Sequence, residues 1–180
     1  MAVKAKYTPS IKVVVTGPFN AGKTTLVRTL TEISIGTERP LSRPEERAVK
    51  SETTVGLDFG LVNLGDGHVV RLFGTPGQRR FSFMWKILSV GMHGYILMVD
   101  STDEESIMES GRIYQEFKSI SPGTPHVISA NKQDMPNALS PDDIRIALDL
   151  PEEAPIVPTV AKDHSSAWET LRTLLRVCAR

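Results

Sequence analysis

Short apolar runs alternate with longer amphipathic stretches along this 180-residue chain. The first run, 11–15, is mostly β-branched and short enough for a buried strand, and the Gly- and Pro-free stretch 24–32 after it predicts a helix. Further strands are expected at 95–100, 127–130 and 156–160, and further helices at about 79–89, 103–120, 141–148 and 165–177. This alternation predicts a mostly parallel sheet with helices on both faces and ligands at the carboxyl ends of the strands.

One hairpin interrupts the alternation. The segments 55–64 and 69–73 flank Gly65-Asp66-Gly67, a turn signal that joins two antiparallel strands. The segment 36–54 before them is polar and lacks apolar periodicity, so we expect a long loop, of which 39–47 becomes ordered only with a nucleotide or a partner. The predicted fold class is therefore α/β, with a mostly parallel six-stranded sheet that carries one antiparallel edge strand.

Polar residues mark the starts of two predicted helices. Ser140 followed by Pro141 is a favourable combination of N-cap and first helical residue. Ser101 or Thr102 is expected near the cap of the helix that begins at about 103.

One loop has a recognisable chemistry. Between the first strand and the first helix lies Gly17-Pro18-Phe19-Asn20-Ala21-Gly22-Lys23-Thr24, which fits G-x-x-x-x-G-K-[ST] at every fixed position. The glycines let the backbone curl so that its N–H groups point inward at a positive helix N-terminus. Lys23 adds a charge against the β/γ-phosphates, and the Thr24 hydroxyl can ligate Mg²⁺. We expect a phosphate site made by Asn20, Ala21, Gly22, Lys23, Thr24 and Thr25.

A second loop follows a buried strand and fits N-K-x-D with Asn131, Lys132 and Asp134. A carboxylate there can accept from both N1–H and N2–H of guanine, which adenine does not offer, and a wrong base leaves a buried acceptor unpaired. Asn131 would brace the loop, and the Lys132 stem would lie over the base. After the last strand, Ala161 would supply a backbone N–H to guanine O6, with Lys162 beside it.

Composition indicates one soluble domain. The chain is 40% hydrophobic, and its 21 basic and 21 acidic residues give zero formal charge and a pI near 6.9, which argues against nucleic acid as a partner. The single cysteine, Cys178, suits a reducing cytosol, and no apolar run approaches the ~20 residues of a spanning helix. We expect an N-terminal tail over 1–10, a single domain over 11–180, a cytoplasmic location and no integral membrane segment.

Further motifs give the chain a family resemblance. Between the two loops lie Thr53-Thr54-Val55-Gly56, Gly74-Thr75-Pro76-Gly77-Gln78 and Val99-Asp100-Ser101. Over roughly 12–177 the sequence resembles the small Ras-superfamily GTPases, in particular Arf and Rab proteins. It is most similar to prokaryotic small GTPases whose second switch reads T-P-G-Q. The resemblance implies a P-loop G-domain that binds GTP or GDP together with Mg²⁺.

The same resemblance assigns roles to the switch residues. Thr54 would bind Mg²⁺ and sense the γ-phosphate, Gly77 would touch that phosphate, and Gln78 would orient the attacking water. It implies Gln78, Lys23 and Thr54 as catalytic residues, and Thr24 and Thr54 as metal ligands. No Arg is evidently placed as a finger in cis, so turnover is expected to be slow, on the order of 10⁻⁴ s⁻¹.

Two positions depart from the family pattern. The switch II aspartate that steadies Mg²⁺ through water is Gly74 here, which predicts weak metal binding unless Asp58, on the strand after switch I, compensates. Phe19 and Asn20 stand where Ras proteins have small glycines. Either Phe19 obstructs an arginine finger or the attacking water, or it turns outward and packs on a switch.

The helix predicted after the T-P-G-Q segment carries an apolar cluster of Phe81, Phe83, Met84 and Trp85. In one interpretation these residues are core at helical spacing. In the other, some form an effector patch, because four large apolar residues within five positions cannot all face inward on one helix.

The sequence thus favours a switch that hydrolyses GTP slowly to GDP and phosphate and whose two switch loops control partner binding. The implied partners are an activating protein, an exchange factor and an effector, with recruitment to a membrane or complex through a partner. We expect a monomer, with a nucleotide-dependent dimer as the alternative.

Two other functions remain open. One is a pseudo-GTPase, which Gly74 and Phe19 favour. The other is a P-loop ATPase or nucleotide kinase, against which Asn131 and Asp134 argue.

Overall fold

A six-stranded sheet forms the centre of the computed structural model, which describes residues 10–33 and 57–180. The strand order is β2-β3-β1-β4-β5-β6. Among these strands only the hairpin pair β2–β3 is antiparallel, so the predicted fold class with one antiparallel edge strand is confirmed. The strands are β1 (Ser10–Thr16), β2 (Asp58–Asn63), β3 (Val69–Gly74), β4 (Gly94–Asp100), β5 (His126–Asn131) and β6 (Ile156–Pro158).

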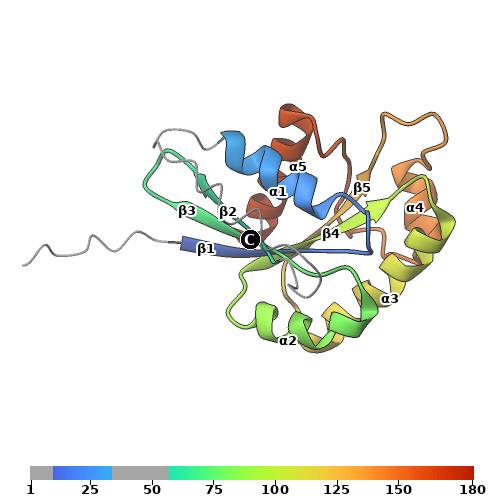
Figure 1. Ribbon diagram of the computed structural model, residues 1–180, viewed down its shortest axis with the longest axis horizontal. Helices are drawn as coiled ribbons and strands as arrows, with labels where there is room; N and C mark the ends of the chain where they lie inside the picture. Colours follow the sequence, from blue (N-terminus) through green and yellow to red (C-terminus); the bar gives the residue numbers. More distant parts are fainter. Residues whose placement is uncertain (1–9, 34–56) are drawn as a thin grey trace, which may run out of the picture.

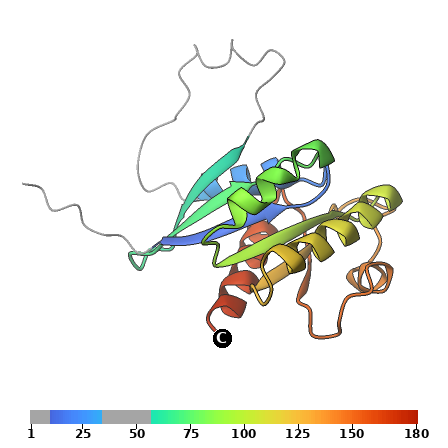
Figure 2. The same cartoon turned by 90° about the horizontal axis from the view of Figure 1, so that it is seen from below.

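Helices cover both faces of the sheet. One face carries α1 (Lys23–Ile33) and α5 (His164–Cys178), and the other carries α2 (Phe83–Ser89) and α3 (Glu104–Ile120) (Figure 1). The view in Figure 2 shows α2 and α3 lying side by side over the same face, and α4 (Pro141–Ala147) packs into the same core cluster. Among the described residues no helix has the length and apolar character needed to cross a membrane.

The core lies in two layers because side chains alternate across each strand. In β1, Val13 and Val15 pack with Leu26 of α1 and Leu171 of α5. Val14 points to the opposite face and belongs to the cluster around α2, α3 and α4. All three valines are fully buried, which explains why this strand is apolar in succession rather than alternating.

The structure confirms one predicted helix cap and identifies the capping residue of another helix. Ser140 caps α4 as predicted, in a capping box with Asp143. Ser101 and Thr102, expected near the cap of α3, directly precede it, and the cap itself is Asp103, whose carboxylate accepts from backbone N–H groups of the first turn. The Thr102 hydroxyl instead donates to Asp100 over 2.6 Å.

Three further boundaries differ from the prediction. β2 begins at Asp58 and β6 ends at Pro158, two residues before the predicted end. The helix predicted over 79–89 is broken at Ser82 into a short 3₁₀ turn, η2 (Arg79–Phe81), and α2. The predicted loop 36–54, with Thr53 and Thr54, lies outside the described residues, as does nearly all of the tail.

Candidate nucleotide-binding site

The loop between β1 and α1 has the backbone that the phosphate motif requires. Gly17, Asn20 and Gly22 have φ of 140°, 63° and 101°. A side chain at Gly17 would meet the Met98 carbonyl oxygen at 2.3 Å, and one at Gly22 would meet the Asn131 amide nitrogen at 2.3 Å. Conformation and close approach therefore both demand glycine at the two fixed positions, and the curled backbone forms an anion nest.

Lys23 lies inside this loop. Its Nζ donates to the backbone oxygens of Gly17 at 2.9 Å and Pro18 at 2.5 Å. Burial lowers the pKa of Lys23 to about 8, and the nearby Asp58 carboxylate opposes that shift in part. A buried ammonium at the start of a helix and beside a ring of backbone N–H groups is suited to a phosphate.

Thr24 meets a carboxylate from the edge strand. Its Oγ1 donates to Asp58 Oδ2 over 2.5 Å. The β2–β3 register places Asp58 opposite Gly74, and a Cβ at Gly74 would lie 2.9 Å from the Asp58 Cβ and 3.2 Å from its Oδ2. The Asp58 side chain therefore lies over Gly74, the position where the resemblance predicts a switch II aspartate, and it reaches the predicted metal ligand Thr24.

The donor set is suited to Mg²⁺. Over the described residues no group of three or more His, Cys, Asp or Glu side chains could hold a metal ion. Mg²⁺ is usually held in nucleotide sites by one or two protein oxygens together with phosphates and water. The Thr24 hydroxyl and the Asp58 carboxylate are such oxygens, so Asp58 is in position to compensate for Gly74.

The T-P-G-Q segment packs against the phosphate loop. A Cβ at Gly77 would lie 2.5 Å from the Phe19 backbone nitrogen and 2.7 Å from Lys23 Nζ. The Gln78 side chain is exposed, and its Oε1 accepts from Arg80 Nε at 2.8 Å. Phe19 is 72% exposed, which favours the outward alternative. The Arg80 contact was not anticipated from the sequence, although Gln78 is followed directly by two arginines.

Asn131 connects three loops. Its Nδ2 donates to the Ala21 oxygen of the phosphate loop at 2.8 Å, and its Oδ1 accepts from Ala161 N at 2.9 Å. The predicted brace is therefore present, and it also spans the two ends of the site. Since the Ala161 N–H donates to Asn131, its proposed bond to guanine O6 would require this contact to be shared or exchanged.

The remaining residues of the base loop are ion-paired. Asp134 Oδ2 lies 2.6 Å from Lys162 Nζ, and this hydrogen bond holds the pKa of the exposed Asp134 carboxyl below its usual range. Lys132 Nζ is paired with Asp100 Oδ2. Of the other predicted site residues, Asn20 and Thr25 are exposed around the loop, and Thr54 lies outside the described residues.

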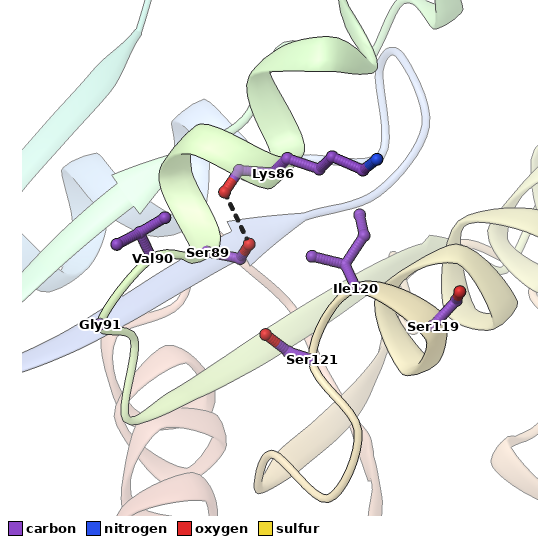
Figure 3. Close-up of a pocket in the computed structure, with 7 residues that line it drawn as sticks. All are labelled: Lys86, Ser89, Val90, Gly91, Ser119, Ile120 and Ser121. Atoms are coloured by element: carbon purple, nitrogen blue, oxygen red, sulfur yellow. Dashed lines mark hydrogen bonds between the residues drawn. The ribbon is translucent and has the colours of Figure 1, made fainter.

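A separate hollow of about 500 Å³ lies between the C-terminal ends of α2 and α3 (Figure 3). Lys86 is the one charged residue of its lining, and its backbone oxygen accepts from Ser89 Oγ at 2.9 Å. Val90 and Gly91 precede β4, so the hollow is at the amino ends of the strands, opposite to the nucleotide loops. The rest of the lining is Ser119, Ile120 and Ser121.

Together, the phosphate nest, the braced N-K-x-D loop and the sheet with one antiparallel edge define a P-loop G-domain of the small-GTPase class. The model of the ADP-ribosylation factor (Arf) family matches residues 1–175. The chain belongs to this family.

Individual proteins similar to this chain carry names of the same family. The chain is 36% identical over 100 residues to ADP-ribosylation factor-related protein 1 of Rattus norvegicus, covering 54% of this chain and 49% of that protein. It is 31% identical over 147 residues to ADP-ribosylation factor-like protein 6 of Caenorhabditis elegans, covering 78% and 70%. It is 31% identical over 144 residues to ADP-ribosylation factor-like protein 3 of Chlamydomonas reinhardtii, covering 77% and 72%. The match to the ADP-ribosylation factor-related proteins spans about half of their length.

Proposed function

We propose that this protein is a guanine-nucleotide switch that binds GTP and GDP with Mg²⁺ and hydrolyses GTP slowly. The observation that carries the proposal is the double hydrogen bond of Asn131, which joins the phosphate loop at Ala21 to the loop after β6 at Ala161. One side chain therefore fixes the phosphate end of the site relative to the base end, as a nucleotide with both ends bound requires.

At the base end, Asp134 gives the specificity. Its carboxylate is exposed and ionised, and it would exchange the Lys162 ammonium for the N1–H and N2–H donors of guanine. Adenine offers an acceptor at N1 and no N2 amine, so it would leave the carboxylate unpaired. Lys132 would contribute the apolar part of its side chain as a surface for the base ring.

At the phosphate end, backbone N–H groups and Lys23 would bind the phosphates, while Thr24 and Asp58 would hold Mg²⁺ directly or through water. When bound, Mg²⁺ neutralises charge that develops on the phosphate oxygens during hydrolysis. Gln78 would orient the attacking water, for which its Oε1 must leave Arg80. This competing contact supports slow turnover without an activating protein.

Partner binding would depend on the segments that touch the phosphate site. Gly77 lies against the phosphate loop, so a change at the γ-phosphate would be transmitted to α2. On α2 Phe83 and Ile87 lie one turn apart on the same side, and both are at least 60% exposed, as is Val90 directly after the helix. We propose this side as a contact for an effector, an activating protein or an exchange factor.

The proposal is tested by releasing the nucleotide from purified protein and then following GTP with and without Mg²⁺. Bound GDP and slow, Mg²⁺-dependent phosphate release are expected, with Gln78→Ala reducing the rate while leaving GDP affinity unchanged. Arg28→Ala, on the exposed side of α1, is the matched control and should change neither. Bound GTP without turnover would instead identify a pseudo-GTPase. Bound ATP or ADP would refute guanine specificity.

A further inference from the structure

Asp100 is a buried carboxylate that faces the base loop from a neighbouring strand. It ends β4 directly opposite Asn131 of β5, and its side chain is 5% exposed. Its Oδ1 accepts from the Thr102 backbone N–H at 3.0 Å and from the Thr102 hydroxyl at 2.6 Å, while Oδ2 is paired with Lys132 Nζ. Over the described part of the chain, the side-chain contacts of this carboxylate therefore serve either its own turn or Lys132.

The backbone conformation of Lys132 is one that depends on surrounding contacts such as this ion pair. Its φ is 67°, in the left-handed region, which strains a residue with a side chain and persists only where surrounding contacts hold it. The Lys132 side chain is 28% exposed, so most of it is shielded from water, and its ammonium is paired with a carboxylate that is itself 5% exposed. The ion pair with Asp100 fixes the ammonium and thereby the course of the stem.

The turn that contains Asp100 also holds the rest of the loop. Leu139 N donates to the Ser101 oxygen at 2.8 Å, and Gln133 Nε2 donates to Ser101 Oγ at 3.1 Å. The ion pair between Lys132 and Asp100 thus joins this turn to the N-K-x-D loop. Asp134, which is ion-paired with Lys162, is not part of this arrangement.

We infer that Asp100 is a positioning residue for base recognition, which holds Lys132 where its stem lies along the ring face of the bound guanine. The inference rests on the proposed function. It assigns two separate tasks to the base end of the site. Asp134 reads the edge of the base, whereas the Asp100–Lys132 pair supports the ring face and so contributes to affinity without selecting one purine from another.

The test is a thermodynamic cycle with Asp100→Asn, Lys132→Met and the double variant, each titrated with GDP, IDP and inorganic pyrophosphate. Asn keeps the size of Asp, and Met keeps an apolar stem without the ammonium. Each single change should raise the Kd of GDP and IDP by a similar factor of about tenfold, and the double variant should be no weaker than either single variant. The Kd of pyrophosphate should not change, which a merely structural role would not predict.

Two further variants serve as a control and as a substitute for Asp100→Asn. Asp103→Asn alters the cap of α3 three residues away and should leave GDP affinity within about twofold of wild type. If Asp100→Asn does not fold, Thr102→Val removes one hydrogen bond to the same carboxylate and should raise the Kd of GDP about threefold.

The outcomes separate the two levels of the argument. Wild-type affinity in Asp100→Asn, unchanged affinity in Thr102→Val, or additive losses in the double variant would overturn the positioning role while leaving the proposed function intact. A loss in Asp103→Asn equal to that in Asp100→Asn would overturn it too. If the wild-type protein binds no guanine nucleotide, the proposed function fails and the inference fails with it.

Discussion

The Thr24 hydroxyl donates a hydrogen bond of 2.5 Å to Asp58 Oδ2, which joins the start of α1 to the edge strand β2. Thr24 belongs to the phosphate motif, whereas Asp58 lies 34 positions later along the chain. Across the hairpin, Asp58 faces Gly74, the position at which the family resemblance predicts an aspartate. The carboxylate is thus supplied by the neighbouring strand, and a glycine opposite leaves room for it.

Asp58→Asn should weaken the dependence on Mg²⁺ without destroying the nucleotide site. An amide keeps the shape but loses the charge that favours the cation, so we expect about a tenfold increase in the Mg²⁺ concentration that half-maximally slows GDP release. Fluorescent GDP release during a Mg²⁺ titration measures this. Asp66→Asn, in the exposed hairpin turn, is the control and should match wild type. Equal Mg²⁺ curves for the two variants would exclude a metal role for Asp58.

Exchanging the two positions gives a second test. Gly74→Asp alone should destabilise the fold by about 1–3 kcal/mol, because its Cβ would lie 2.9 Å from the Asp58 Cβ and two carboxylates would face each other. Asp58→Gly combined with Gly74→Asp should recover both stability and the Mg²⁺ response. Urea unfolding and the same release assay measure the two effects. A double variant as unstable as Gly74→Asp would contradict the exchange.

Nucleotide affinity should fall above about pH 8. In the free protein, burial lowers the pKa of Lys23 to about 8, whereas bound phosphate favours the charged ammonium and raises it. Below pH 8 the lysine is charged in both states and contributes no pH dependence. Above pH 8 binding must take up a proton, so the Kd of GDP should rise by up to about tenfold per pH unit. Calorimetry in buffers of different ionisation enthalpy should detect the proton uptake, and Lys23→Arg should abolish it.

Replacing two aromatic residues of α2 by alanine should change the unfolding free energy by very different amounts. Trp85 is 2% exposed and its Nε1 donates to the Pro76 oxygen at 3.2 Å, so Trp85→Ala should cost about 3–5 kcal/mol of unfolding free energy. Phe83 is 60% exposed, so Phe83→Ala should change the unfolding free energy by less than about 0.5 kcal/mol. Chemical denaturation measures both. Comparable losses would mean that Phe83 is also core.

Asp134→Asn should change base preference rather than abolish binding. A carboxamide offers one donor and one acceptor, so it complements the N1–H and O2 of xanthine better than the two donors of guanine. The ratio of XDP to GDP affinity should rise by at least about tenfold. Asp142→Asn, on the exposed first turn of α4, is the control. An unchanged ratio would show that Asp134 does not read the base edge.

Much of the site could be predicted because its motifs are local. The tight phosphate loop requires the conformations of Gly17 and Gly22, and both residues lie within one short motif. The strand and helix around this loop follow from apolar periodicity. The exact capping residue of α3 could not be chosen from the sequence, because three polar residues in succession could serve. In the structure the Thr102 hydroxyl donates to Asp100, and the Asp103 carboxylate caps the helix.

The sequence by itself determined the α/β class, the phosphate and base loops and membership of the small GTPases, because spacing along the chain fixes backbone shape and motif chemistry. Tertiary structure decided which distant groups meet. Sheet register brought Asp58 over Gly74, and strand adjacency brought Asp100 to Lys132. No local pattern encodes these pairs, since each depends on how two strands align after the chain has folded.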